Sequence, residues 1–289
     1  MGWVTIDKDK CSECGICALR CPFSFSKQDS VVTAHADENS CSLCGHCVSL
    51  CPEGAIVHHK MDMSNFVEIG DNATFETDAF IRFIRARRSH RHFKDKDIPR
   101  EILEKLIDVC RYAPTGGNAQ TVRAIVAQNP KKRQKLSDLT VDFFIQMGEG
   151  AEKTLEEMKG RETESIASLE TMQILANYKN RLSMARAAGY DPVFYKAPAV
   201  VIFHSHSQTR TPKDDCVIAS TTMSLTARTM GLEATYIGLF EMAAKMYQPV
   251  SEELKLPPGH EVYSVVIMGY PKLAYLRTVD RNPIKTRWE

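Results

Sequence analysis

The chain has 289 residues, and its 37 basic side chains are almost balanced by 36 acidic ones. Because neither sign is in excess, the composition gives no indication of nucleic acid binding or of a disordered acidic tail. The length predicts two domains, and we expect no membrane span because no run of 18 apolar residues occurs.

The first feature along the chain is a cysteine pattern that occurs twice. Each copy has four cysteines, separated by two, two and three residues and followed by proline. The first copy comprises Cys11, Cys14, Cys17 and Cys21, and the second comprises Cys41, Cys44, Cys47 and Cys51. Bacterial ferredoxins with two [4Fe–4S] clusters have this pattern, and their fourth cysteine ligates the other cluster. We therefore expect one cluster on Cys11, Cys14, Cys17 and Cys51, and a second on Cys41, Cys44, Cys47 and Cys21.

Zinc is the alternative metal for such cysteines. A structural zinc ion commonly takes its ligands from two separated pairs, whereas each run here has four cysteines and ends in proline. The first residues lack the apolar segment of a secretory signal, so ten cysteines favour metal ligation in a reducing, cytoplasmic compartment over disulfides. Ferredoxin clusters transfer single electrons, so the rest of the chain should receive or supply them.

The cysteine runs fall within residues 1–60, which we expect to form the ferredoxin domain. A short apolar strand candidate follows the second run, and polar turn residues then predict a linker at 61–74. We interpret the pair His58-His59 as exposed polar residues at the edge of this domain. Residues 75–289 are expected to form the second domain.

Two helices are predicted at the start of the second domain. The first begins near Thr77 and places Phe80 and Ile84 on one face. The second begins after Pro99 and ends at Ala113-Pro114. A third helix, rich in small residues, is predicted at 214–230 with Gly231 at its end. Two cysteines, Cys110 and Cys216, lie on the apolar faces of these helices, and we interpret both as core residues.

Strand candidates lie between the predicted helices, at 122–127, 199–204 and 262–268. The intervening stretch, about 131–190, is polar and favours helix. Because the order lacks a regular βαβ repeat, it predicts an α+β fold. His204 and His206 would point the same way from a strand, so a metal is conceivable there, but the sequence shows no third ligand.

A basic run, Arg87 to Arg91, follows the first helix of this domain. A solvated charged face would explain it, but so would a clamp for a phosphate, because arginine can donate two hydrogen bonds to one anion. Four further motifs follow in order, at 113–120, 231–238, 269–271 and 281–284. Together the five motifs resemble the nitroreductase family of FMN flavoproteins, and the resemblance covers residues 76–289.

The resemblance implies an α+β domain with a central mixed sheet flanked by helices, which forms a homodimer with FMN at the subunit interface. The residues that would hold the FMN phosphate, ribityl chain and pyrimidine edge are Arg87, Arg88, Ser89 and Arg91. The residues that would meet the flavin from the partner subunit are Pro114, Thr115 and Gly116, with Asn118 nearby. Backbone groups of Tyr236, Ile237, Gly238 and Leu239 would lie beside the flavin ring, and Arg281 would close on the phosphate.

The stretch at about 140–190 is long for this family. It predicts a lid or dimer arm over the flavin, and a surface helical excursion is the alternative. Substrate contacts could come from Tyr178, Arg181, Tyr190 or Tyr195. No side chain in the motifs is an obvious general acid or base, so we expect the flavin itself to be the reactive centre.

Together, the two halves predict an oxidoreductase. Electrons would pass from the two [4Fe–4S] clusters to FMN and on to a small organic acceptor such as a nitroaromatic, a quinone or an activated alkene. The donor could be a ferredoxin or another redox protein, and NAD(P)H is the alternative. No G-x-G-x-x-G follows a strand candidate, so the sequence gives no indication of a dedicated nicotinamide domain. The alternatives are an electron relay that serves a protein partner and a reductive dehalogenase-type flavoenzyme.

Overall fold

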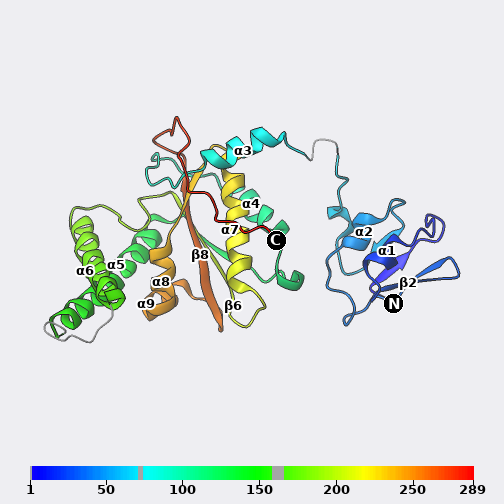
Figure 1. The fold of residues 1–289 in the computed structure, drawn as a ribbon, viewed down its shortest axis with the longest axis horizontal. Coiled ribbons are helices and arrows are strands. Elements are labelled where there is room, and N and C mark those ends of the chain that lie inside the picture. The colour runs from blue at the N-terminus through cyan, green and yellow to red at the C-terminus, as the bar shows by residue number, and fades with distance from the viewer. Residues whose placement is uncertain (1, 71–73, 158–165) are drawn as a thin grey trace. The chain divides into compact units, whose positions relative to one another are not determined.

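The computed structural model describes residues 2–70, 74–157 and 166–289. Contacts between residues divide the chain into two compact units, which are drawn in Figure 1. The smaller unit comprises Met1–Thr77 and Gly117–Ala119, and the larger comprises Asp78–Gly116 and Gln120–Glu289. Within the expected linker, 61–74, a 3-10 helix η1 covers Met63–Asn65, while residues 71–73 lie outside the described part.

The smaller unit contains two pairs of short antiparallel strands. Strand β1 (Val4–Ile6) pairs with β4 (Ile56–His58), and β2 (Phe25–Gln28) pairs with β3 (Val31–Ala34). Two five-residue helices, α1 (Ile16–Arg20) and α2 (His46–Leu50), complete it. Its core is small and consists of Val4, Phe25, Val32, Ala36 and Ile56 packed around Cys47. So small a core predicts that metal ligation contributes to folding.

The larger unit contains a four-stranded sheet in the order β5–β6–β8–β7. Its strands are β5 (Arg123–Ala127), β6 (Ala199–His206), β7 (Glu233–Tyr236) and β8 (His260–Gly269). Side chains along β6 alternate between two cores, because successive residues of a strand point to opposite faces. Val200 and Ile202 belong to one core, and Val201 and Phe203 to the other.

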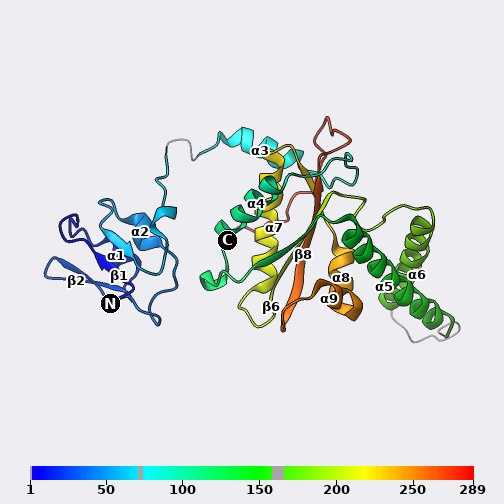
Figure 2. The same cartoon turned by 180° about the vertical axis from the view of Figure 1, so that it is seen from behind.

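Helices cover both faces of this sheet (Figure 1). Helices α4 (Arg100–Val109) and α7 (Pro212–Thr229) cover one face with the 3-10 turn η3 (Cys110–Tyr112). On the other face lie α5 (Pro130–Glu157), α8 (Gly238–Met246) and α9 (Gln248–Leu254), which Figure 2 shows from behind. Helix α6 (Ile166–Ala187) packs against α5 on the side away from the sheet. Helix α3 (Thr77–Ala86) has no buried residue, and its Phe80, Ile81 and Ile84 are exposed.

Small residues allow α7 to lie close to the sheet, as its sequence predicts. Ala219 and Ser220 are fully buried, and the Oγ atoms of Ser220 and Ser264 are 2.8 Å apart. Both cysteines of this region belong to the same core: burial raises the pKa of Cys216 to about 12, and the Cys110 thiol donates to the Leu106 carbonyl. Their interpretation as core residues is confirmed.

The sheet differs in one detail from the mixed sheet that we expected. All neighbouring strand pairs in the described residues are antiparallel. A single crossover helix would make neighbouring strands parallel. Here α5 and α6 form a helical hairpin that returns the chain to the end of the sheet where β5 stops, and α8 and α9 act likewise between β7 and β8. Each pair of neighbours is therefore antiparallel.

We expect opposite effects from alanine at two glycines of the larger unit. Gly231 follows α7 at φ +75°, and an added Cβ would meet open space, so Gly231→Ala should cost about 1 kcal/mol through backbone strain alone. Gly150 lies inside α5 with open space around it, so Gly150→Ala should stabilise by about 0.5–1 kcal/mol. Denaturant unfolding of the holoprotein measures both. A stabilising Gly231→Ala would contradict the strain argument.

Candidate functional site

The eight motif cysteines surround two separate cavities in the smaller unit. The first cavity is lined by Cys11, Cys14, Cys17 and Cys51. The second is lined by Cys21, Cys41, Cys44 and Cys47. Each set takes three cysteines from one run and the last cysteine from the other, which is the grouping that the sequence predicts for two clusters.

The local backbone explains how each run curves around its cavity. Gly15 and Gly45 adopt left-handed conformations, at φ 84° and 70°, and each begins a short helix. A residue with a side chain rarely adopts such angles, so glycine is required at both turns. The two halves also repeat the same bond, because the Cys11 and Cys41 amides each donate to an aspartate carbonyl, of Asp7 and Asp37, at 3.0 Å.

The cysteines stand apart rather than converging on a point. Among the described residues, no three His, Cys, Asp or Glu side chains come together closely enough to hold one metal ion. In a [4Fe–4S] cubane each thiolate binds a different iron, so the four sulfurs stand farther apart than the ligands of a single zinc ion. The chemistry of four thiols around one cavity therefore fits a cubane.

His58 is not exposed, and our expectation for it was wrong. Its side chain is 1% exposed, whereas His59 lies on the surface and contacts Thr5 Oγ1. The cause is the two-residue period of β4, which turns Ile56 and His58 inward when β4 pairs with β1. His58 Nε2 lies 3.3 Å from Cys41 Sγ, and burial lowers the pKa of the imidazole.

The basic segment after α3 is fastened to β7. The His90 amide donates to the Ala234 carbonyl at 3.4 Å, and the Thr235 hydroxyl donates to the His90 carbonyl. These bonds leave Arg87, Arg88 and Ser89 half-buried and Arg91 exposed. The segment therefore has a fixed backbone with its arginine side chains partly in solvent.

A buried charge cluster beneath this segment was missed by sequence reasoning. Glu233 Oε1 lies 3.5 Å from Arg228 Nη2, and Glu233 Oε2 lies 3.7 Å from His90 Nε2. Burial raises the pKa of Glu233, and the charges of Arg228 and Arg87 oppose that shift. Two further donors of Arg228, Nε and Nη1, are buried without a partner in the described residues. The cluster thus holds cationic donors behind the basic segment.

An open cavity of about 920 Å³ brings the predicted flavin and lid residues together. Its wall includes Arg91, Tyr178, Arg181, Tyr190, Tyr195, Tyr236, Ile237, Gly238 and Leu239. The last four residues are the end of β7 and the start of α8, where the first helical amides have no intrahelical acceptor. Arg91 stacks over the Tyr195 ring at 5.6 Å. The cavity thus combines aromatic faces, cations and free backbone donors.

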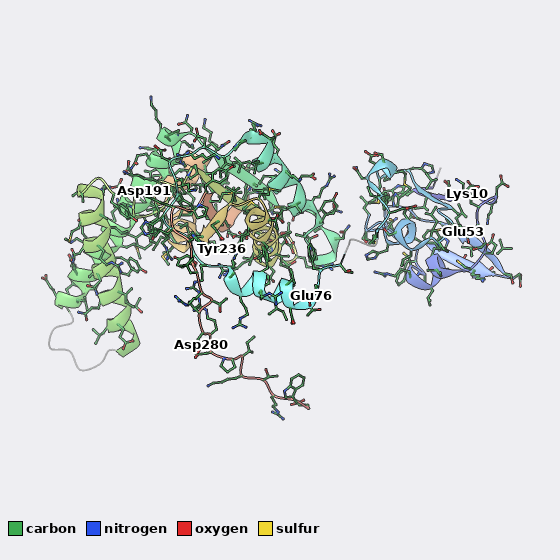
Figure 3. The ribbon with its side chains drawn as sticks, turned by 90° about the horizontal axis from the view of Figure 1, so that it is seen from above. Lys10, Glu53, Glu76, Asp191, Tyr236 and Asp280 are labelled. Carbon is green, nitrogen blue, oxygen red and sulfur yellow. The ribbon has the colours of Figure 1, made fainter. Side chains whose placement is uncertain are left out.

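Asp191 holds one wall of this cavity, and sequence reasoning missed it. It is buried, as is Ser137, whose hydroxyl donates to it at 2.6 Å, and the amides of Val193, Phe194 and Lys196 donate to it at 3.0–3.1 Å. Figure 3 shows Asp191 and Tyr236 in the body of the larger unit. The Asp-Pro dipeptide in the sequence was a turn signal that could have drawn attention to this loop.

The predicted loop residues Pro114, Thr115 and Gly116 lie elsewhere and do not line this cavity. The Gly116 amide donates to the buried carboxylate of Asp215 at 3.0 Å, and a Cβ on Gly116 would come within 2.1 Å of Thr211 Oγ1. The short 3-10 helix η4 (Gly116–Asn118) follows, with Asn118 at φ 57°. The loop is therefore held in one conformation, and its residues do not line the cavity of their own chain.

Arg281 does not line the cavity either. It lies in an exposed tail, and the segment that carries Asp280 extends away from the rest of the larger unit (Figure 3). Its amide donates only to Asp280 Oδ1, at 2.9 Å, within the same tail. Among the described residues, then, the basic segment and Tyr236–Leu239 come together, whereas the loop and Arg281 do not join them.

Comparison with known proteins identifies both parts of the chain. The profile of the 4Fe-4S dicluster domain matches residues 10–56, and that of the Nitroreductase family matches residues 84–270, which is more than half of the chain. The chain belongs to the nitroreductase family. This membership confirms the resemblance drawn from the five motifs and the α+β fold class.

Individual relatives agree with this membership. A protein of Archaeoglobus fulgidus, described as an NADH dehydrogenase or NAD(P)H nitroreductase, is 26% identical over 66% of this chain and 85% of its own length. Crystal structures of nitroreductases with bound FMN from Bacteroides fragilis and Desulfitobacterium hafniense are each 21% identical. Their TM-scores are 0.54 and 0.52, over 72% of this chain and 98% and 97% of theirs. At this identity the likeness shows a shared fold.

Part of the stretch that we expected to be a lid, 140–190, forms the second half of α5 and helix α6 in this nitroreductase-family chain, while 158–165 lie outside the described residues. Phe143 and Phe144 of α5 are buried in the core, and α6 contributes Tyr178 and Arg181 to the cavity wall. None of the described helices is long and apolar enough to cross a membrane.

The pair His204 and His206 gains a third histidine, His260, which comes from β8. The Nδ1 atoms of His204 and His260 are 3.0 Å apart, and the rings of His206 and His260 are 5.7 Å apart. This partner is 56 residues from His204 in sequence, so the sequence could not reveal it. Burial, His260 and Arg123 together lower the pKa of His204 to about 4.

The low pKa of His204 predicts a loss of stability in mild acid. Below pH 6.5 the unfolded chain binds a proton at this histidine, while the folded chain does not until about pH 4. We expect the free energy of unfolding to fall by up to about 3 kcal/mol as the pH drops through this window. Denaturant titrations at several pH values measure this. The free energy of unfolding should fall less steeply with falling pH in His204→Gln than in the exposed control His92→Gln. Equal slopes in the two variants would contradict this origin.

Proposed function

We propose that this nitroreductase-family protein is an FMN-dependent oxidoreductase that passes electrons from two [4Fe–4S] clusters through FMN to a small organic acceptor. The observation that carries the proposal is that one chain has both sets of four cysteines and a cavity where Arg91 meets Tyr236–Leu239 beneath an aromatic wall. When bound, FMN supplies the exchange of two electrons with an organic acceptor. The clusters supply electrons one at a time.

The residues around the cavity fit FMN. Its phosphate needs cationic donors, and Arg87 and Arg88 would provide them: both are half-buried and belong to the same basic segment as Arg91, which lines the cavity. Its ring needs a flat apolar surface and hydrogen-bond donors at one edge, and the backbone of Gly238 and Leu239 at the start of α8 offers such donors. Arg91 would place positive charge beside the reduced, anionic ring, which favours that state.

A homodimer would complete the site. Residues 114–116 and Arg281 do not reach the cavity of their own chain, and the family resemblance assigns both to flavin contacts. In a dimer, the loop and the tail of a second copy would supply them. The bond from the Gly116 amide to Asp215 keeps the loop in one conformation, so it could meet the ring without reordering.

The acceptor would stack on the flavin beneath the wall formed by Tyr178, Tyr190 and Tyr195. These rings offer apolar faces to a planar molecule, and Arg181 offers a cation to a nitro, carbonyl or phenolate oxygen. A nitroaromatic, a quinone or an activated alkene fits that description. The donor would be a reduced ferredoxin or another redox protein that meets the clusters.

An anaerobic reductive titration tests the proposal. The purified holoprotein should contain FMN and take up about four electrons per chain, two for FMN and one for each cluster. The reduced protein is then mixed with nitroaromatics, quinones, enoates and halophenols in single-turnover experiments. A protein without bound flavin would contradict the proposal, and reoxidation only by protein acceptors would instead support the electron relay.

A matched pair of variants tests the flavin assignment. Arg88→Met removes a cation from the proposed phosphate site and should raise the dissociation constant for FMN by about tenfold or more, the effect of one charged hydrogen bond. Arg100→Met removes an exposed arginine of α4 that pairs with Glu104, and should leave this constant unchanged. Titration of the two apoproteins with FMN measures both, and equal constants would place the phosphate elsewhere.

A further inference from the structure

The second cysteine cavity has a buried imidazole at its edge, and the first does not. His58 is 1% exposed, and its Nε2 lies 3.3 Å from Sγ of Cys41, a predicted ligand of the second cluster. The two cysteine runs repeat after 30 residues, so the position that corresponds to His58 is Gln28. Gln28 is exposed at the end of β2, and no described side chain donates to Cys11, which corresponds to Cys41. The two sites are thus unequal in this contact.

The hydrogen bonds of His58 fix which of its nitrogens carries the proton. Nδ1 accepts a hydrogen bond from the Lys60 amide at 3.3 Å, so it carries no proton in the neutral ring. The proton is then on Nε2, the atom that faces Cys41 Sγ. A cysteine thiolate bound to iron can only accept, so the direction of the bond is from His58 to the sulfur.

We propose that His58 donates an N–H···S hydrogen bond to Cys41 and thereby raises the reduction potential of the second [4Fe–4S] cluster. Reduction adds an electron and makes the sulfur ligands more electron-rich, so a donor to Cys41 stabilises the reduced cluster more than the oxidised one. His58 is a positioning and tuning residue: it contacts a ligand and not the iron. The inference rests on the cluster part of the proposed function.

The first cluster has a different contact. Among its predicted ligands, Cys51 Sγ accepts the Ala55 amide at 3.3 Å. That donor belongs to the backbone and is present whatever side chains surround it. The imidazole at Cys41, by contrast, is a side-chain donor, so a single substitution at His58 can remove it. It raises the share of electrons that the second cluster holds above the share that this cluster would hold without the imidazole.

Redox titration followed by electron paramagnetic resonance tests this inference on the holoprotein. His58→Met removes the donor and keeps an apolar side chain of similar length. One of the two cluster potentials should shift downward, and the ratio of reduced to oxidised second cluster at the wild-type midpoint should fall by up to about tenfold. His58→Gln keeps an N–H donor near the same position and should restore most of the potential. Gln28→Met, at the corresponding exposed position, should move neither potential.

A spectroscopic measurement on the wild-type protein tests the inference even if His58→Met does not assemble its clusters. Protein labelled with ¹⁵N-histidine should show a nitrogen hyperfine coupling to the reduced cluster, transmitted through the hydrogen bond, and His58→Gln should lose it. Absence of the coupling, unchanged potentials in His58→Met, or an equal shift of both clusters would overturn the inference. A protein without two clusters would instead contradict the proposed function, so the two failures are distinguishable.

Discussion

Serine in place of Cys51 is expected to cost the chain its first cluster, although Cys51 belongs to the second cysteine run. Cys51 lines the same cavity as Cys11, Cys14 and Cys17, whereas the other three cysteines of its own run do not line that cavity. A serine hydroxyl is a poorer iron ligand than a thiolate, so iron should fall from about eight to about four atoms per chain. Iron and sulfide analysis of anaerobically purified protein measures the loss.

Two further ligand variants identify which cluster is lost. Cys14→Ser should remove the first cluster and Cys44→Ser the second, since each lines only one cavity. The resonance spectrum of the cluster that remains in Cys51→Ser should therefore match that of Cys14→Ser. A match to Cys44→Ser would show that the fourth cysteine stays with its own run. Cys110→Ser, in the core of the larger unit, should retain both clusters.

Local patterns predicted much of the structure. The cysteine spacing predicted both groups around the cavities, because the reach of a short loop and the following proline depend only on neighbouring residues. Apolar periodicity likewise predicted the helix at Thr77–Ala86 and the central strands. The strand at 199–206 extends two residues beyond the expected end, into His206, because pairing with β8 continues that far.

Distant contacts could not be predicted in this way. The sequence shows His58 only as half of a polar pair. Its burial depends on the pairing of β4 with β1, which joins residues 50–54 apart, from Ile6 with Ile56 to Val4 with His58. The direction of the sheet pairs depends on how the two helical hairpins fold, which no single segment specifies. The acids that fix the site, Glu233 and Asp215, have partners in other elements. The partners of such side chains can be identified only in the folded structure.

Alanine in place of Asp191 should cause a large loss of stability in the larger unit. The buried carboxylate accepts hydrogen bonds from Ser137 Oγ and from three amides of the following loop. Its removal leaves those donors buried without partners, so the free energy of unfolding should fall by about 3 kcal/mol. The loop also contains Tyr195 and Lys196 at φ 56° and 54°, and such backbone angles persist only where the surroundings enforce them.

The same substitution should also change the shape of the cavity wall. Tyr190 precedes this loop, Tyr195 belongs to it, and both line the cavity, so relaxation of the loop removes part of the wall that would face the acceptor. Asp191→Asn keeps one acceptor oxygen, so its loss of stability should be smaller than that of alanine. Its amide group also adds two donors that face other donors, so a loss of about 1–2 kcal/mol should remain. Asp138→Ala, whose carboxylate accepts from Gln134 on the surface of α5, should change stability by less than about 0.5 kcal/mol. Denaturant unfolding followed by flavin release measures all three, and an Asp191→Ala as stable as Asp138→Ala would mean that the loop holds its shape without the carboxylate.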